Sequence, residues 1–453
     1  MHLQDSLRQR RQKLAQRFKH PVALWSGCSS PRNFRSNTFP FRASSHFLYF
    51  AGLPLENAVI RMEAGSLELF IDEGTPSSAL WHGETPTRQE LAEAIGADAA
   101  FPMADLGTRI QDAATLAVQS ESTCQQQSKF LKRDTSATLS GHDLELAAAI
   151  VALRLTHDQG AVEELRLAAQ VTVSAHLSGM AATATAKRES EIRAAMESVI
   201  MAEDMSCSYQ SIVTVHGEVL HNNHYHHPIH AGDLLLADVG AEAATGWAAD
   251  VTRTWPVSGR FSATQRAVYE VVLAAHDACI AKVAPGVEYQ DLHLLAAQVI
   301  AEGLVDLGIL QGQPEDLVAM DAHALFFPHG VGHLLGLDVH DMEDLGDLAG
   351  YESGRVRSDR FGLCYLRLNR PLRPGMLVTI EPGFYQVPAL LQDSERRAKY
   401  QKVVDWERLE AFADVRGIRI EDDVLVTESG HEVLTGALPT APNAIEDLTS
   451  GSS

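Results

Sequence analysis

The segment DLLLADVGAEAATGWAADVTRTWPVSG, residues 233–259, decides our fold prediction for the C-terminal half of the chain. Two apolar runs flank a turn that contains glycine, a pattern typical of an antiparallel β-hairpin. Asp238 ends the first run and Asp250 opens the second, so the hairpin would bring two carboxylates to one region. Aspartate also caps strand ends commonly, and this segment alone favours that simpler explanation.

The segment PHGVGHLLGLDVHD, residues 328–341, contains three histidines. His329 and His333 are four residues apart, which on a helix would resemble a zinc-protease pair. The glycines between them disfavour a helix, and the glutamate expected after the first histidine is missing. In an extended segment the two side chains would also share one side. The alternative is that these histidines are ordinary buried core residues. A third histidine in the same glycine-rich stretch, His340, makes that alternative weaker.

Two further segments carry acids at or in apolar strands. In RPGMLVTIEPGFY, residues 373–385, Glu381 follows the strand and either faces solvent or points inward. In GIRIEDDVLVT, residues 417–427, Glu421 and Arg419 share one side of the strand. An ordinary solvated Arg–Glu face would also explain that pattern.

Together these segments supply four carboxylates and one imidazole, a set that suits two adjacent divalent cations. An apolar core does not normally point so many acids inward without a cation to offset their repulsion. The sequence therefore predicts a dinuclear metallohydrolase, with Asp238, Asp250, His333, Glu381 and Glu421 as the metal ligands.

The segment VHGEVLHNNHYHHPIHAG, residues 215–232, contains six histidines. Such a density indicates either adventitious metal binding in a loop or one functional imidazole among bystanders. Elsewhere the sequence shows no Gly-x-Ser-x-Gly elbow, no phosphate-binding loop and no paired Cys-x-x-Cys motifs.

Composition excludes some classes of partner. The net charge of −22 would repel a phosphate backbone or an anionic membrane, so we expect neither nucleic acid nor membrane as a partner. No run is long enough for a transmembrane span. Five widely spaced cysteines predict free thiols and a cytoplasmic location. The Arg-rich N-terminus could belong to a transit peptide, but a surface helix with Leu3, Leu7, Leu14 and Phe18 near one face is our preferred interpretation.

The first part of the chain reads as a smaller α/β domain, residues 1–157. Strand-like and helical patterns alternate along it. The strands are expected at 47–52, 58–62 and 67–71, and a helix at 88–95.

Helical periodicity then runs over residues 144–201, interrupted at THDQG, residues 156–160, where we place the domain boundary. Two more helices are expected at 263–283 and 289–307. The second domain would span residues 158–445, and residues 446–453 would form a disordered tail. The expected fold class is α+β.

Four sequence motifs of this chain resemble motifs of one enzyme family, and they occur in the same order as in that family. The chain resembles the proline-specific metallopeptidases, prolidase and aminopeptidase P, which have a creatinase-like pita-bread catalytic domain. The segments 39–53 and 80–83 also resemble members of this family, so the resemblance covers nearly the whole chain. The four motifs are ADVTRTWPV (249–257), HGVGHLLGLDVHD (329–341), PGMLVTIEPGFY (374–385) and GIRIEDDVLVT (417–427).

The resemblance implies roles for the four acids and the histidine. Asp238 would chelate one metal ion, Asp250 and Glu421 would bridge two, and His333 and Glu381 would complete the other site. Manganese is the usual metal of the family, and Co²⁺ or Zn²⁺ would also suit the ligands. A hydroxide that bridges the two ions would be the nucleophile, and Glu381 would accept its proton and pass it to the leaving nitrogen.

The resemblance also implies a set of substrate contacts. His221 would contact the substrate, and His340 would polarise the scissile carbonyl or steady the oxyanion. Arg367 would grip the substrate carboxylate. The remaining assignments are His329 in the pocket wall, Arg419 beside the metal carboxylates or the substrate, and Trp81 reaching the active site of a partner subunit in a homodimer.

One departure from the family pattern affects the metal ligands. The stretch from Asp238 to Asp250 is one residue longer than the family's usual hairpin. An extra residue within a strand would turn Asp250 to the wrong face, whereas one in the turn at 243–246 would preserve both ligands. We expect the second arrangement.

The resemblance implies an Xaa-Pro dipeptidase that releases proline from small peptides with proline in the second position. Arg367 and the insertion at 386–416 favour a prolidase. An aminopeptidase acting on longer Xaa-Pro peptides is the alternative. A third class is a catalytically inactive binding protein, or a metal-free amidinohydrolase, on the same fold. Either would be expected to have lost several of the five ligands.

Overall fold

The computed structural model describes residues 3–450, and by their contacts these residues form two compact units. The first contains the chain up to Glu164 together with 244–247, and the second contains 165–243 and 248 onward. The boundary expected between 157 and 158 stays a prediction. No helix among the described residues is long and apolar enough to cross a membrane.

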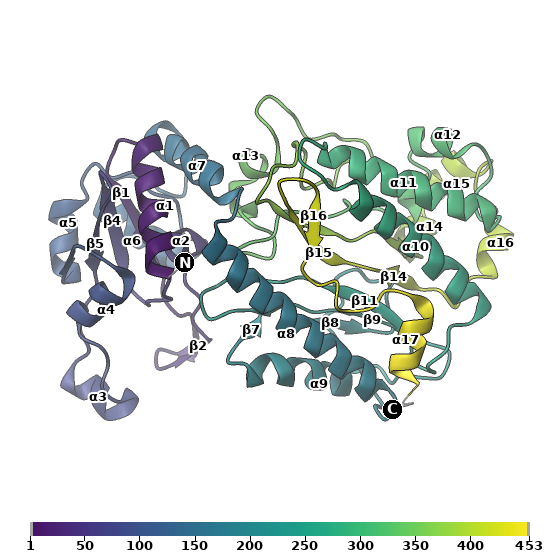
Figure 1. Ribbon diagram of the computed structural model, residues 1–453, viewed down its shortest axis with the longest axis horizontal. Helices are drawn as coiled ribbons and strands as arrows, with labels where there is room; N and C mark the ends of the chain where they lie inside the picture. Colours follow the sequence, from purple (N-terminus) through teal and green to yellow (C-terminus); the bar gives the residue numbers. More distant parts are fainter. Residues whose placement is uncertain (1–2, 451–453) are drawn as a thin grey trace. The chain divides into compact units, whose positions relative to one another are not determined.

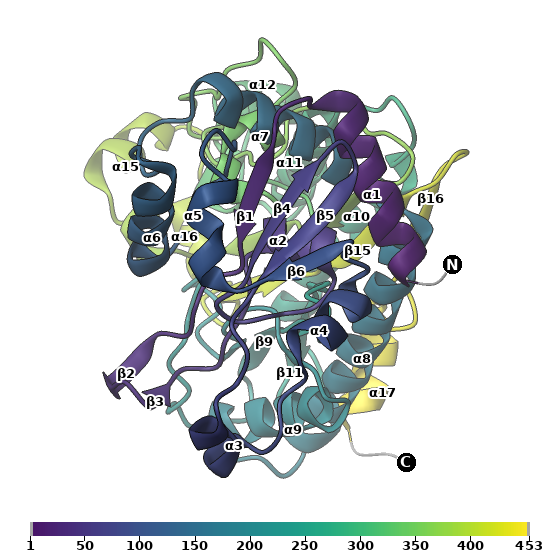
Figure 2. The ribbon, with the colours of Figure 1, turned by 90° about the vertical axis from the view of Figure 1, so that its left-hand side faces the viewer.

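The first unit is built on a four-stranded sheet in the order β1-β4-β5-β6, visible in Figure 2. Its first three strands pair antiparallel and β6 is parallel to β5. The expected strands at 58–62 and 67–71 are confirmed as β4 and β5, and the helix at 88–95 as α4. The sheet strands are β1 (Val22–Trp25), β4 (Val59–Glu63), β5 (Ser66–Phe70) and β6 (Ala99–Phe101).

The strand expected at 47–52 is wrong, because these residues form helix α2, Ser45–Ala51. All seven residues of α2 are buried, and the helix ends at Gly52 in the left-handed conformation, φ 72°. A short apolar run bounded by glycine fits a buried strand and a buried helix equally well, so periodicity alone could not separate them.

The other elements of the first unit surround the sheet. Helix α1 confirms the helix expected at the N-terminus, and its Leu7 and Leu14 are buried. A Thr87–Glu90 capping box begins α4. The remaining elements are α1 (Leu3–Arg17), β2 (Pro31–Phe34), β3 (Asn37–Thr38), α3 (Pro76–His82), α4 (Arg88–Ile95), η1 (Met103–Asp105), α5 (Leu106–Arg109), α6 (Glu121–Leu131) and α7 (Gly141–Arg154).

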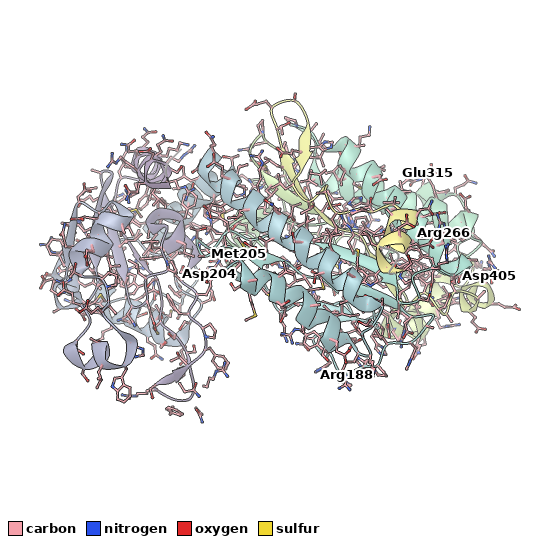
Figure 3. All side chains as sticks on the ribbon, turned by 60° about the horizontal axis from the view of Figure 1, so that its bottom comes forward. Arg188, Asp204, Met205, Arg266, Glu315 and Asp405 are labelled. Atoms are coloured by element: carbon pink, nitrogen blue, oxygen red, sulfur yellow. The ribbon has the colours of Figure 1, made fainter. Side chains whose placement is uncertain are left out.

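In the second unit, helices α8 and α9 pack against a sheet in the order β11-β9-β8 (Figure 1). Their shared core includes the fully buried Trp255, whose indole N–H donates to Thr183 at 2.9 Å. Arg188 and Asp204 mark the two ends of α9 in Figure 3. The elements are α8 (Gln159–Thr183), α9 (Glu189–Ala202), β8 (Ile212–Thr214), β9 (Leu234–Asp238) and β11 (Thr252–Pro256).

A second group of strands completes this unit, with α10 and α11 as its longest later helices. The sheets are ordered β12-β15-β16, β13-β14 and β10-β7. The helices expected at 263–283 and 289–307 are confirmed as α10 and α11. The elements are β7 (Ser206–Cys207), β10 (Ala241–Glu242), α10 (Ala263–Lys282), α11 (Tyr289–Asp306), α12 (Pro314–Ala319), η2 (His323–Leu325), η3 (Glu343–Leu345), α13 (Asp347–Gly350), β12 (Leu377–Ile380), β13 (Gly383–Tyr385), α14 (Pro388–Leu391), α15 (Ser394–Tyr400), α16 (Trp406–Glu410), β14 (Gly417–Arg419), β15 (Asp422–Val426), β16 (His431–Val433) and α17 (Pro442–Thr449).

The C-terminal segment differs from the disordered tail expected at 446–453. Residues 446–449 lie in α17, where Ile445 and Thr449 are buried and hold the helix against the unit. Residues 451–453 lie outside the described part of the chain.

Candidate metal centre

The β9–β11 hairpin carries two acids on one face. Asp238 pairs with Thr252, and the same register continues through the 3.0 Å bond from the Val239 N–H to the Val251 carbonyl. The same register holds at the Glu242–Ala248 bridge. The residue by which this hairpin exceeds the family's usual length therefore lies in the turn at 243–247. Asp250 stands two residues before Thr252 and shares its face. The hairpin therefore presents Asp238 and Asp250 side by side.

A glycine makes this hairpin tight. In this register Gly240 lies opposite Asp250, and a Cβ there would come within 1.8 Å of the Ala249 carbonyl oxygen. Only a residue without a side chain allows the strands to approach this closely. Gly240 thereby helps to hold the facing aspartates in position.

The histidine segment runs extended beside β12, as its glycines predict. The Thr379 N–H donates to the His333 carbonyl at 3.0 Å, and the Glu381 N–H donates to the Val331 carbonyl at 2.8 Å. Gly332 has φ 154°, and a Cβ there would lie 2.2 Å from the Thr379 carbonyl oxygen. This close approach aligns His333 with Glu381.

The last two acids face each other across neighbouring strands. Ile380 pairs with Asp422, and Gly383 pairs with Arg419 in the next ladder. Both ladders have the same offset, so Glu381 lies opposite Glu421. The Glu421 N–H donates to the Thr252 carbonyl at 3.0 Å, which ties this strand pair to the hairpin.

All five expected ligands consequently line one cavity of about 540 Å³. Donor atoms of Asp250, His333 and Glu421 lie within 4.8 Å of one another. His333 Nε2 is 3.4 Å from Asp250 Oδ2 and 3.5 Å from Glu381 Oε1. The solvated Arg–Glu face considered for Arg419 and Glu421 is wrong, because both side chains are buried.

The electrostatics of this cluster suit cations. Burial raises the pKa of Asp238, Asp250 and Glu421 above the usual range, and for Asp238 and Glu421 the neighbouring carboxylates act in the same direction. Burial likewise raises the pKa of Glu381 to about 8. Without added positive charge, such a cluster would retain protons at neutral pH. Divalent cations would relieve that cost, so the donor set fits them.

The His333 ring is prepared to act as a ligand. Its Nδ1 lies 3.0 Å from the Leu334 carbonyl oxygen, to which it donates as the protonated ring nitrogen. That leaves the Nε2 lone pair facing the acids. Burial lowers the pKa of His333 to about 4, so the imidazole is neutral near pH 7.

Two supporting side chains, Tyr209 and Thr252, were not predicted from the sequence, and Tyr209 belongs to no motif. The Tyr209 hydroxyl lies within hydrogen-bonding distance of both Asp238 and Asp250, at 2.6 Å from the latter. The Thr252 hydroxyl donates to Glu421 at 2.7 Å. Arg419, which was expected in this role, donates to Asp238 at 2.5 Å and to the Tyr385 hydroxyl at 2.9 Å. Of the two unpredicted side chains, only Thr252 could have been found from the sequence, because it lies two residues after Asp250 and therefore on the same face of the strand.

The expected substrate residues divide between the two units. His221, His329, His340 and Arg367 all line the cavity. Arg367 and His340 both contact Glu343, a residue that the sequence analysis did not select. Trp81 lies on α3 of the first unit with 77% of its surface exposed, and its predicted contact with a partner subunit stays a prediction.

Only His221 of the six clustered histidines lines this cavity. His227 instead donates from Nδ1 to the buried Glu189 at 2.8 Å, a structural contact. Among the described residues one other group could hold an ion, namely the exposed His20, His142 and Glu145. Its two rings stack with centroids 3.6 Å apart, so a shared ion would lie outside both ring planes. That arrangement is poor for coordination.

Comparisons with known proteins agree with this geometry. Residues 163–428 match the family described as Metallopeptidase family M24, and residues 7–120 match the N-terminal domain of aminopeptidase P. The chain is 32% identical over 418 residues to a probable Xaa-Pro aminopeptidase of Pyrenophora teres f. teres, covering 90% of this chain and 87% of the relative. It is 32% identical over 464 residues to the human Xaa-Pro dipeptidase, covering 97% and 91%.

Solved structures show the same architecture. Pseudomonas aeruginosa aminopeptidase PepP superposes with a TM-score of 0.80 at 29% identity, covering 98% of both chains. A zinc-substituted aminopeptidase P from E. coli, in complex with product, gives a TM-score of 0.78 at 26% identity, again over 98% of both chains. These matches confirm the expected fold class, an N-terminal domain followed by a catalytic domain of the M24 type.

Proposed function

This chain belongs to metallopeptidase family M24, and from that premise we propose that it hydrolyses the bond between a first residue and a following proline, in Xaa-Pro dipeptides. The observation that carries the proposal is one cavity that joins a cation-compatible acid cluster to a partly exposed guanidinium. The acids lie beside His333, and the guanidinium belongs to Arg367. A dipeptide carries its terminal carboxylate on the residue next to its scissile bond, so a single cavity could engage both groups.

We propose that five side chains hold two divalent cations. These are Asp238, Asp250, His333, Glu381 and Glu421. When bound, the cations supply Lewis acidity and lower the pKa of water toward neutrality, which provides the nucleophile. We propose Mn²⁺ as the native metal, with Co²⁺ and Zn²⁺ as alternatives, because oxygen ligands with one imidazole suit all three.

We propose that Glu381 moves a proton in the reaction. Its carboxylate faces the cavity, and its side chain is 17% exposed. A carboxylate in this position accepts the proton of the attacking water and returns it to the proline nitrogen as the C–N bond breaks. The proline nitrogen must gain this proton to leave as a neutral secondary amine instead of as an anion.

Three histidines complete the reaction site. His340 and His221 line the cavity from different segments and would orient or stabilise the scissile carbonyl. His329 Nε2 is 2.9 Å from the Tyr385 hydroxyl, and burial lowers its pKa to about 3, so this ring is neutral. A neutral His329 suits the wall of a pocket for a substrate that carries its own charges.

An aminopeptidase that acts on longer Xaa-Pro peptides is the second candidate. One structural observation favours it: Glu343 already pairs with Arg367, the guanidinium that a dipeptide carboxylate would need. Relatives named Xaa-Pro aminopeptidase also stand beside the dipeptidase at similar identity. The two candidates differ only in what the far end of the cavity accepts.

A substrate-length series tests the proposal. Metal-free protein is loaded separately with Mn²⁺, Co²⁺ or Zn²⁺, and hydrolysis of Ala-Pro, Ala-Pro-Ala and Ala-Ala is followed by amine release. We expect metal-dependent cleavage of the proline substrates and little of Ala-Ala. Faster cleavage of Ala-Pro supports the dipeptidase, and faster cleavage of Ala-Pro-Ala supports the aminopeptidase. No cleavage with any metal would refute both.

We also propose a homodimer. Leu80 and Trp81 are neighbours on α3, and each is 77% exposed, an apolar pair that a partner subunit would cover. Light scattering should give twice the mass of one chain, and a Leu80→Ser, Trp81→Ser double variant should shift it toward a monomer. A monomeric wild type would exclude this proposal.

A further inference from the structure

Glu343 bridges two residues of the cavity wall. Its carboxylate pairs with the Arg367 guanidinium, and its other oxygen accepts from His340 Nδ1 at 2.6 Å. The three side chains are 33–46% exposed, so each is accessible from the cavity. A single carboxylate thus links the predicted carboxylate clamp to the predicted oxyanion residue.

The backbone is shaped to place Glu343 there. Met342 is fully buried and has φ 59°, a left-handed conformation that non-glycine residues adopt at a cost. This reverses the chain, and the Glu343 N–H then donates to the His340 carbonyl at 3.2 Å. The turn holds Glu343 back against the residue three positions before it, which indicates a built feature of the site and not a loosely placed surface acid.

The Arg367–Glu343 pair also lies where two cavities adjoin. A smaller cavity of about 150 Å³ lies next to the main one, and both are lined by His333, His340, Glu343, Arg357 and Arg367. Arg357, the other guanidinium here, is paired with Asp347 at 2.7 Å. Each positive charge at this end of the cavity therefore already has a carboxylate partner within the protein.

We propose that Glu343 is an internal competitor for the carboxylate of a dipeptide substrate. It occupies Arg367 until the substrate carboxylate replaces it, and it thereby sets how strongly the protein prefers dipeptides over longer peptides. The inference rests on the proposed function and assigns to Glu343 the control of substrate length. Glu343 is a positioning residue, since it acts through Arg367 and His340.

The physical reason is the balance of charge on one guanidinium. An arginine pairs best with one carboxylate at a time, because a second brings like-charge repulsion. A dipeptide must displace Glu343 or bind beside it, whereas a longer peptide has no carboxylate at this position. Glu343 should consequently weaken the binding of dipeptides and leave longer or amidated substrates unaffected.

The neutral variant Glu343→Gln separates the two contacts. A glutamine oxygen still accepts from His340 Nδ1, while the ion pair with Arg367 is lost. In Glu343→Ala both contacts are lost. Glu343→Gln should therefore change KM for dipeptides alone, and Glu343→Ala should in addition lower kcat for all substrates, because His340 loses its anchor.

The experiment compares Ala-Pro with Ala-Pro amide, which differ only in the terminal charge, using the full-length Mn²⁺-loaded protein. For Glu343→Gln we expect KM for Ala-Pro to fall about twofold to fivefold, the range of a half-exposed ion pair, with KM for the amide unchanged. kcat should stay constant for both substrates. Equal changes for the two substrates, no change, or a higher KM for Ala-Pro would overturn the proposal.

Two further variants provide the controls. Glu352→Gln removes a carboxylate that also pairs with arginines, Arg373 at 3.1 Å and Arg370 at 3.8 Å, but that does not line either cavity. It should leave the ratio of the two KM values unchanged. In an Arg367→Gln background, Glu343→Gln should no longer discriminate between the substrates, and a persistent effect there would contradict the assigned route.

Failure of the inference can be told apart from failure of the proposed function. If wild-type protein cleaves both substrates and Glu343→Gln shifts them equally, only the role of Glu343 is lost. If wild-type protein cleaves neither substrate with any of the three metals, the proposed function is refuted and the inference falls with it.

Discussion

The two ends of the cavity are held in different ways. At one end, acids stand on paired strands whose register brings Asp238, Asp250, Glu381 and Glu421 together, with exposures of 9% or less for three of them. At the other end, Arg367 lies in a loop and Glu343 begins the short helix η3 that follows a loop, and their side chains are 37% and 46% exposed. Strand register fixes geometry rigidly, whereas half-exposed charges on loops can exchange partners. The first arrangement suits chemistry common to all substrates, and the second suits a choice between substrates.

The strongest test of the strand-held end is Glu381→Ala. Removing a group that carries a proton in the reaction should lower kcat by about 10²–10⁴-fold. The metal-free variant should be no less stable than the wild type, because the folded state no longer has to keep a proton on a buried carboxyl that the unfolded chain ionises at neutral pH. Steady-state kinetics with Ala-Pro and a thermal melt provide the two measurements. Wild-type turnover would remove Glu381 from the mechanism.

The same end should make metal-free protein sensitive to pH. The folded pKa of Glu381, about 8, lies above its unfolded value near 4.5, so the folded state keeps a proton that the unfolded chain releases. Relative to a Glu381→Gln variant, the stability of the metal-free wild type should therefore fall as pH rises from 4.5 to 8, by on the order of 5 °C in Tm. The comparison with the variant cancels the opposite contribution of buried histidines such as His329 and His333, whose pKa is lowered. Saturating Mn²⁺ should flatten this dependence. A Tm difference between the two proteins that stays constant, or that shifts in favour of the wild type as pH rises, would contradict the assignment.

Tyr209→Phe tests the support beneath the acids. The variant removes a hydroxyl that contacts Asp238 and Asp250 while keeping the ring. Loss of such a supporting contact should weaken metal affinity by about tenfold. Titration of metal-free protein with Mn²⁺, followed by calorimetry, measures it. Tyr269→Phe is the matched control, because its hydroxyl donates to the Thr440 carbonyl at 2.7 Å, away from the cavity. Equal losses in the two variants would indicate a general structural effect.

The difference between the two ends also explains what the sequence could predict. The acids and His333 follow or interrupt apolar strands, so alternation and motif spacing indicate both their side of the strand and their chemistry. The extended conformation around His333 was predictable from its glycines. Placing the additional hairpin residue in the turn required the observed register, because the sequence was consistent with a shift inside the strand as well.

The loop-held end could not be predicted in the same way. The pairing of Glu343 with Arg367 joins residues 24 positions apart and depends on the left-handed turn at Met342, for which methionine gives no signal. Tyr209 belongs to no motif and reaches the acids only through tertiary packing. The helix at α2 was missed for a related reason, since burial on all sides removes the periodicity that separates helix from strand.

Arg357→Gln is expected to have the smallest effect on KM. It tests whether a second arginine at the loop-held end contributes to binding the substrate carboxylate. Arg357 lines both cavities, but its guanidinium is shared between Asp347 and the Leu366 carbonyl, to which it donates at 2.8 Å. A guanidinium with two protein partners offers less to a substrate carboxylate than Arg367 does. KM for Ala-Pro should therefore rise by only about twofold, the size of a weak exposed ion pair, with KM for Ala-Pro amide unchanged. If the rise instead matched that of Arg367→Gln, the two arginines would form a joint clamp, and competition at Arg367 alone would not determine substrate length.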